Sequence, residues 1–306
     1  MRKLKHNKFI RILFFGNYFY GLCAVALSIE AAMQQRFPLA GALFYLLVFS
    51  STVLYYTRAY MITEVSDDRA NIRSMWYARN HRMLFLSQGV FFILLIAGGI
   101  GFLVLRWKNI INMNGLEWFS LLVFPVVSAL YYGVNDPLFG NHNLRNIGWL
   151  KPFIIGYTWA GSVTVYPILY YCVDKGIHYE ISFVGWFLFI KNFMYITILC
   201  IMFDIKDYAM DYNQDIKTIV LKLGLRKTIF YFIIPLSIIG LASFLIYAIS
   251  KDFSAAKIAI NTLPFLAIIT VAYSMSNRRS IFYYLVIIDG LMLFKAVCGI
   301  IAMRYF

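Results

Sequence analysis

Long uninterrupted apolar runs constrain this chain more than any other feature of its sequence. Several of them reach the roughly 20 residues that a helix needs to cross the hydrocarbon core of a bilayer. Strands of a membrane β-barrel would instead show short segments of alternating hydrophobicity. We therefore predict an all-α, polytopic membrane protein with nine transmembrane helices, over residues 9–29, 39–62, 83–105, 117–134, 152–173, 181–203, 228–249, 259–275 and 280–302.

Composition supports this prediction, because 61% of the 306 residues are hydrophobic and only 14% are charged. The first apolar range follows MRKLKHNK and contains CAVAL, so it also has features of a signal peptide. We expect it to be the first transmembrane helix, because it is long and a polytopic chain follows it. The four cysteines and four histidines are scattered, and they predict neither a disulfide framework nor a zinc or haem site.

The net charge of +14 is explained by membrane topology, since Lys and Arg collect in cytoplasmic loops. With nine spans, nineteen of these cations lie on the side of the N-terminus. We therefore place the protein in the cytoplasmic (inner) membrane, with the N-terminus and the loop after the sixth span cytoplasmic and the C-terminus outside. No soluble basic domain predicts a nucleic-acid partner. Seven cations lie on the outer side: Arg36, Arg106, Lys108, Lys175, Lys251, Lys257 and Arg304.

One short stretch breaks the apolar pattern, FDIKDYAMDYNQDIKTIVLKLG at 203–224. In a helix, its acidic residues Asp204, Asp207, Asp211 and Asp215 lie on one narrow face. Like charges at this spacing destabilise a helix by a few tenths of a kcal/mol per pair, so we expect a positive partner. Mg²⁺ is a suitable partner, because it prefers oxygen ligands and is often shared between carboxylates and substrate phosphates.

The alternative is a solvated cytoplasmic helix whose acidic face meets water. Lys206 and Lys217 fall on the opposite face of the helix, which this alternative also allows. Asp204 favours a function, because it adjoins the apolar end of the sixth span, where an unpaired charge is costly.

The 203–224 stretch resembles the second Asp-rich motif of the UbiA superfamily of intramembrane prenyltransferases. That motif reads roughly D-x-x-D-x-x-x-D and continues to K-T-L-P-x-x-L-G. The match here is Asp204, Asp207 and Asp211, then Lys217-Thr218-Ile219-Val220, then Leu223-Gly224. The stretches LRNIGWLKPFIIGYTWAGSVTVYP at 144–167 and FYYLVIIDGLMLFKA at 282–296 are also similar to bacterial members.

The resemblance covers most of the chain and implies a single UbiA-like transmembrane domain over 1–306, a bundle of nine helices. It implies Mg²⁺-dependent transfer of an isoprenoid chain from a prenyl diphosphate to a lipophilic acceptor, such as an aromatic compound or a quinone precursor. Asp204, Asp207 and Asp211 would be the metal ligands and the catalytic residues. Lys151 and Lys217 would hold diphosphate oxygens, or would simply set topology as interfacial charges.

The chain departs from the family at the first motif, roughly N-D-x-x-D after the second helix. Tyr56-Thr57 stand about where the Asn-Asp pair would fall, and no Asp follows three residues later. Glu64 and Asp67 lie slightly further on, as a displaced metal pair or part of a solvated loop. This departure supports an alternative, a UbiA-like membrane protein without transfer chemistry that binds lipid or a partner.

Charged residues well inside predicted spans include Lys191, Lys295 and Asp289. Such residues serve ion or substrate pathways in transporters, which gives a third hypothesis. Asp289 would be the partner of Lys295 or an acid beside a pocket. The many aromatic residues form an interfacial belt, or line a pocket for a cation or an isoprenoid chain.

Overall fold

The computed structural model describes residues 8–62, 72–132, 147–213, 217–275 and 283–306, which are helical and contain no β-strand. The prediction of an all-α fold is confirmed for these ranges. The helices are α2 (Lys8–Phe15), α3 (Tyr18–Gln34), α4 (Ala42–Ile62), α5 (Ile72–Arg79), α6 (His81–Ile111), α7 (Gly115–Tyr132), α8 (Lys151–Ala160), α9 (Tyr166–Lys175), α10 (Phe183–Asn213), α11 (Ile219–Leu223), α12 (Leu225–Lys227), α13 (Ile234–Ser250), α14 (Ala255–Ser274) and α16 (Asp289–Tyr305).

Helices lie over the described part of all nine predicted ranges. In the described residues, five helical stretches are long and apolar enough to cross a membrane: His81–Ile111, Phe183–Tyr208, Leu225–Ser250, Ala255–Ser274 and Tyr284–Tyr305. The pair α2 and α3 makes a sixth if it counts as one span, broken by a bend of 64°. The total of nine transmembrane helices therefore stays a prediction.

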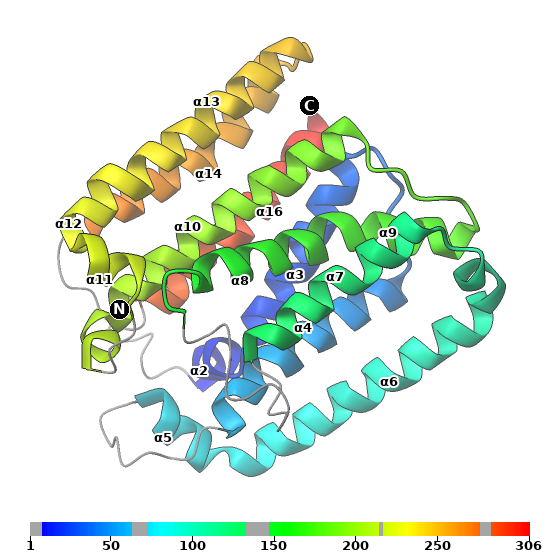
Figure 1. Cartoon of the computed structure of the whole chain (residues 1–306), viewed down its shortest axis with the longest axis horizontal. Helices are drawn as coiled ribbons and strands as arrows, with labels where there is room; N and C mark the ends of the chain where they lie inside the picture. The colour runs from blue at the N-terminus through cyan, green and yellow to red at the C-terminus, as the bar shows by residue number, and fades with distance from the viewer. Residues whose placement is uncertain (1–7, 63–71, 133–146, 214–216, 276–282) are drawn as a thin grey trace.

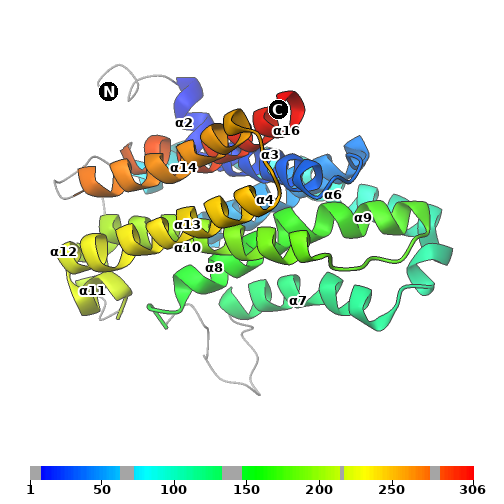
Figure 2. The ribbon, with the colours of Figure 1, turned by 90° about the horizontal axis from the view of Figure 1, so that it is seen from above.

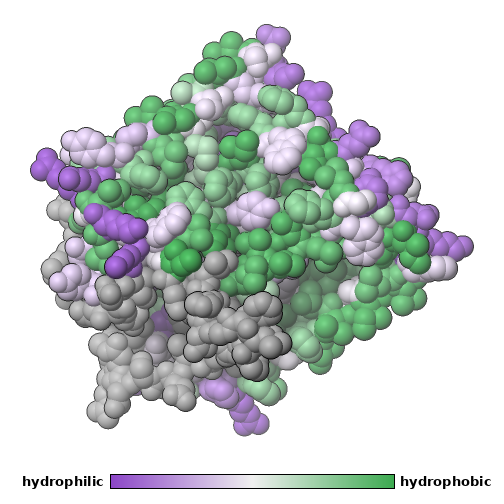
Figure 3. All heavy atoms as spheres, viewed as in Figure 1, coloured by the Kyte–Doolittle hydropathy of each residue, from purple (hydrophilic) through white to green (hydrophobic). Residues whose placement is uncertain are grey.

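The outer helices present apolar side chains rather than polar ones. No residue in the most apolar stretch of α6 is buried, and Phe85, Ile93 and Leu105 are all largely exposed. Figure 3 shows one face of the molecule mostly covered by hydrophobic residues, with hydrophilic residues gathered toward its edges. A surface of this kind is stable against lipid, and in water it would be a large exposed apolar patch.

Three helices, α3, α10 and α16, form the centre of the bundle. The helix α10 packs along α8, and α16 packs against both α3 and α14. The helix α4 packs between α3 and the outer α6, and α13 packs on α14 at the other edge (Figures 1 and 2). The central helices therefore contribute most of the side chains available to a buried polar site.

Three π-helical turns interrupt the α-helices: η2 (Gly161–Val165), η3 (Thr228–Ile233) and η4 (Tyr284–Ile288). The first two lead directly into prolines, Pro167 and Pro235, near the starts of α9 and α13. Proline lacks an N–H donor and crowds the carbonyl one turn earlier, so a wider turn before it relieves the strain. The third leads directly into Asp289, a buried acid at the start of α16.

A buried ionic cluster joins the three central helices. Lys295 of α16 donates a hydrogen bond to Glu30 of α3 at 2.6 Å, and Lys191 of α10 lies 3.9 Å from the same carboxylate. Gln34 links them, because it donates to Glu30 and accepts from Lys191, each at 2.9 Å. Gly299 leaves room for the acid, since a Cβ there would lie 2.5 Å from Glu30.

This cluster corrects one expectation from the sequence. Asp289 is not the partner of Lys295, which pairs with Glu30 instead. The signal in the sequence was the position of Glu30, an acid at the end of the first predicted span, which ordinarily marks a paired or functional group. Lys191 and Lys295 share this acid, so both act in helix packing.

We expect Glu30→Gln to destabilise the protein by roughly 3–5 kcal/mol, because it leaves two ammonium groups buried without their carboxylate. Equilibrium unfolding of the purified protein in mixed micelles measures this change. The matched control is Glu180→Gln at an exposed acid, where a change within about 0.5 kcal/mol is expected. Equal unfolding free energies for the two variants would contradict a structural role for Glu30.

Candidate functional site

The acidic stretch begins within the last turns of the apolar part of the central helix α10. The apolar span runs over Phe183–Tyr208, and the helix itself ends at Asn213. Asp204 is buried, with 1% of its surface exposed, whereas the Asp207 side chain is partly exposed. The solvated-helix alternative therefore does not describe Asp204, which faces the protein interior.

Lys151 supplies a positive partner for Asp204. Its Nζ lies 3.1 Å from Asp204 Oδ1, and Lys151 is the first residue of α8. Close packing of α8 on α10 makes this contact possible, because a Cβ on Gly156 would lie 2.2 Å from Thr197 Oγ1. Only glycine permits this approach, and it brings the start of α8 beside the acidic end of α10.

Lys151 lies just ahead of the predicted span at 152–173, and its charge is strongly favoured. Burial is the largest single influence and would lower the pKa of Lys151, but attraction to Asp204 and Tyr131 and the hydrogen bond to Asp204 together oppose it. Asp207 acts in the same direction, so the pKa of Lys151 lies above its ordinary value. A permanently charged lysine between two carboxylates is suited to receive an anionic ligand.

Lys206 belongs to the site, although its position on a helical wheel is on the face opposite the aspartates. Its Nζ lies 3.1 Å from Asp207 Oδ1 and 5.8 Å from the centre of the Phe203 ring. The lysine side chain is long enough to reach around the helix to its neighbour, which a wheel drawn from Cα positions does not capture. Lys151 and Lys206 are thus the lysines that pair with the described carboxylates of α10.

Several predicted residues lie elsewhere or outside the described part of the chain. Lys217 is exposed ahead of α11, and no salt bridge joins it to a described carboxylate. The motif residue after it has a structural role, since Thr218 Oγ1 accepts a hydrogen bond from the Leu221 N–H and caps α11. The side chain of Asp211 and all of Asp215, Glu64 and Asp67 lie outside the described residues.

A third acid, Asp289, reaches the same end of the bundle from α16. It is buried, accepts a hydrogen bond from the Tyr20 hydroxyl, and lies within electrostatic range of Arg73 and Lys206. Cys200, one turn before Asp204 on α10, lies within electrostatic range of both Asp204 and Asp289. Asp289 therefore lies beside the site. Of the two alternatives from the sequence, a partner for Lys295 or an acid beside a pocket, its position agrees with the second.

A cluster of aromatic rings adjoins Asp289 through Tyr20. Tyr20 and Tyr56 stack with ring centres 4.7 Å apart, and Trp159 lies within 6.5 Å of both. The Trp159 indole N–H donates to the Tyr56 hydroxyl. The faces of such rings stabilise cations, and their apolar bodies exclude water.

At Tyr56-Thr57, where the resemblance predicted the first motif, the described residues form a hydrogen-bond network without a carboxylate. Thr57 is fully buried, accepts a hydrogen bond from Asn17 at 3.1 Å and donates to the Gly16 carbonyl at 3.4 Å. Arg73 donates to Asn17 Oδ1 at 2.6 Å, and Tyr77 donates to the Phe15 carbonyl at 2.9 Å. These bonds hold the bend between α2 and α3, so this position carries structure rather than metal ligands.

The described acids meet part of what a magnesium site requires. Among the described residues, no group of three or more His, Cys, Asp and Glu side chains is gathered as a metal site. Mg²⁺ commonly takes only one or two protein carboxylates, and substrate phosphates and waters complete its shell. Asp204 and Asp207 supply two oxygen-donor side chains on adjacent turns of one helix, so they fit a metal that a diphosphate shares.

Comparison with known proteins adds no relative. No family model matches the chain, no curated protein matches it, and no solved structure matches it. The arguments for function therefore rest on the residues and their geometry.

We expect Lys151→Met to destabilise the protein by about 3 kcal/mol, because it leaves the buried Asp204 carboxylate without its lysine. The double variant with Asp204→Asn should recover part of this loss, since both charges are then removed. Chemical unfolding of the two variants in detergent measures the coupling.

Lys175→Met is the matched control for this substitution. Lys175 also pairs with an aspartate, 3.6 Å from Asp174, but its side chain is 56% exposed. An exposed pair of this kind contributes less than about 1 kcal/mol. If Lys151→Met costs no more than the control, the pair with Asp204 has no special role.

Proposed function

We propose that this protein is an intramembrane prenyltransferase of the UbiA type. It transfers an isoprenoid chain from a prenyl diphosphate to a lipophilic acceptor, an aromatic compound or a quinone precursor. The observation that carries the proposal is the pairing of Asp204 with Lys151 and of Asp207 with Lys206 where the apolar part of α10 ends. In this proposal nine helices cross the inner membrane, and the acidic end of α10 faces the cytoplasm.

The paired aspartates and lysines at this site suit an exchange, in which each lysine leaves its carboxylate for a phosphate oxygen. Each described carboxylate on α10 lies 3.1 Å from a lysine. Asp204 and Asp207 would hold the metal of a magnesium diphosphate, and Lys151 and Lys206 would bind its phosphate oxygens. Neither lysine loses a partner, so the desolvation cost of each buried charge stays compensated.

The residues around the acids have separate tasks in the transfer. Lys151 and Lys206 neutralise the diphosphate as the bond from its oxygen to the allylic carbon breaks and the electron pair leaves with oxygen. Bound Mg²⁺ adds Lewis-acid stabilisation of the departing diphosphate. The faces of Tyr20, Tyr56 and Trp159 stabilise the allylic cation and exclude water until the acceptor attacks.

A second candidate function follows from the network around Thr57. Thr57 binds Asn17 and the Gly16 carbonyl there, and it stands where the first motif would place an acid. A protein with one acidic motif can bind an anionic lipid through Lys151 and Lys206 without breaking its bonds. This alternative predicts lipid binding that does not need a metal.

Thermal stability with and without ligand separates the two candidates. We expect a prenyl diphosphate with Mg²⁺ to stabilise the detergent-purified protein by about 2.7 kcal/mol at 100 times its Kd. Asp207→Asn should abolish this stabilisation, because it removes one of the two oxygen-donor carboxylates. Asp207 is preferred to Asp204 for this test, since its side chain is partly exposed and its loss disturbs folding less.

Asp174→Asn is the matched control, because Asp174 is also partly exposed and paired with basic residues, Arg106 and Lys175. Its magnesium-dependent shift should equal that of the unmodified protein. Stabilisation without magnesium would favour the lipid-binding alternative. No stabilisation by donors of several chain lengths would overturn both forms of the proposal.

A further inference from the structure

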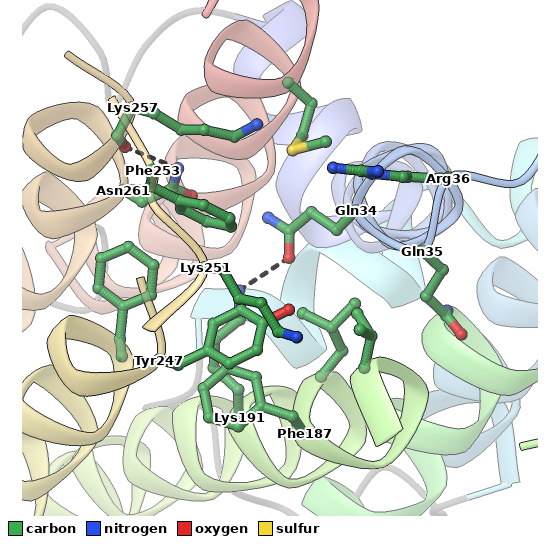
Figure 4. A pocket seen from close by; sticks show the side chains of 14 residues that line it. Gln34, Gln35, Arg36, Phe187, Lys191, Tyr247, Lys251, Phe253, Lys257 and Asn261 are labelled. Carbon is green, nitrogen blue, oxygen red and sulfur yellow. Dashed lines mark hydrogen bonds between the residues drawn. The ribbon is translucent and has the colours of Figure 1, made fainter. Parts of the chain in front are cut away.

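A polar cavity lies at the other end of α10, far from Asp204. It has a volume of about 270 Å³, and its walls come from the ends of α3, α13 and α16 and the starts of α10 and α14. Lys191 on α10 lines it, and Asp204 lies about 20 Å further along the same helix at 1.5 Å per residue. Figure 4 shows this cavity from close by.

Among the residues that the structure describes, no carboxylate lines this cavity, but four cations do: Arg36, Lys191, Lys251 and Lys257. Three of the seven basic residues predicted on the outer side of the membrane are thus gathered in one place. Within the part of the chain that the structure describes, Arg36, Lys251 and Lys257 take part in no salt bridge. Arg36 also lies within electrostatic range of Lys257, so like charges crowd together.

Lys191 connects the cavity to the buried ionic cluster. Its side chain is 10% exposed, and the carboxylate it approaches, Glu30, is shared with Lys295. One carboxylate therefore serves two buried ammonium groups, and no second described carboxylate lies within salt-bridge distance of either. An anion in the cavity would compensate this excess of positive charge in a low-dielectric environment.

The backbone holds Arg36 in an unfavourable conformation. The N–H groups of Phe37 and Arg36 donate to the carbonyls of Ala32 and Met33, each at 3.0 Å, which ends α3 in a Schellman motif. Arg36 has a φ of +58°, in the left-handed region where glycine is preferred. An arginine at this position is less stable than a glycine would be, but it places a guanidinium at the cavity. This cost points to a function for the Arg36 side chain.

The remaining walls are aromatic and amide side chains. Phe187 and Tyr247 stack with ring centres 4.4 Å apart, and the Lys257 ammonium lies 4.8 Å from the centre of the Phe253 ring. Asn261 of α14 also lines the cavity. In Figure 4 the Arg36 and Lys257 side chains extend toward one another above Lys251 and Lys191. Several donors and apolar rings together suit an anion with more than one oxygen and an apolar part.

We propose that this cavity binds a phosphate-bearing amphiphile, with the phosphate on Arg36, Lys191, Lys251 and Lys257 and the apolar part against Phe187 and Tyr247. Arginine and clustered lysines match the several oxygens of a phosphate. Because a water molecule occupies about 30 Å³ of liquid, the cavity holds a group of headgroup size. The phosphate belongs to an anionic phospholipid of the outer leaflet or to a soluble phosphate ester, and the site is independent of the proposed prenyl transfer.

Binding of two probes to delipidated protein in detergent tests this proposal. Phosphatidylglycerol is followed by native mass spectrometry, and glycerol phosphate is followed by a shift in melting temperature. We expect Lys257→Gln to weaken binding of the occupying probe at least ten-fold. The matched control, Lys175→Gln, alters an exposed cation that lies outside the cavity and should bind like the unmodified protein.

Arg36→Gly separates binding from folding, because the two roles predict opposite signs. Glycine relieves the positive φ, so the melting temperature without ligand should rise. The shift caused by the probe should nevertheless fall, because the guanidinium is gone. Binding of phosphatidylglycerol alone identifies the source as lipid, and binding of both probes identifies a general phosphate site. Unchanged affinity in Lys257→Gln and Arg36→Gly, or an equal loss in Lys175→Gln, would overturn the proposal.

Discussion

The Glu30 carboxylate accepts a hydrogen bond from Lys295 at 2.6 Å and lies 3.9 Å from Lys191, so one acid ties α3, α10 and α16 together. The centre of an apolar bundle offers no water to compensate a charge, and each buried ion therefore needs a partner from another helix. These three helices carry most of the packing, and the polar sites at both ends of the bundle are built on them. The position of α10, which contributes Lys191 and Asp204, is fixed by this cluster.

The two ends of α10 carry opposite kinds of polar chemistry. At the acidic end, Asp204 and Asp207 are each paired with a lysine, and Asp289 approaches from α16. At the basic end, four cations and no described carboxylate line a cavity. The acidic end suits a metal and the phosphates that share it, because each described carboxylate of α10 there is paired with a lysine. The basic end suits an anion without a metal, because its described lining offers no carboxylate to hold one.

The sequence predicted helix positions well, because apolar runs and their polar breaks are local signals. It predicted Asp204 as a buried functional acid because a charge at the end of an apolar span is costly. It could not predict Lys206 beside Asp207, since a flexible side chain reaches around the helix, or Glu30 as the partner of Lys295, since that contact joins residues 265 positions apart. The role of Thr57 was also hidden, because its network depends on how α2 bends against α3.

We propose that Lys151 and Lys206 exchange their carboxylate partners for the phosphates of a prenyl diphosphate. This exchange is tested by an experimental structure of the protein in a lipid nanodisc. The sample would contain Mg²⁺ and a prenyl thiolodiphosphate, which resists cleavage. We predict density for the diphosphate between the two lysines, with Asp204 and Asp207 turned toward the metal. A ligand-saturated structure in which both lysine–aspartate pairs persist, with the diphosphate bound elsewhere, would contradict the account.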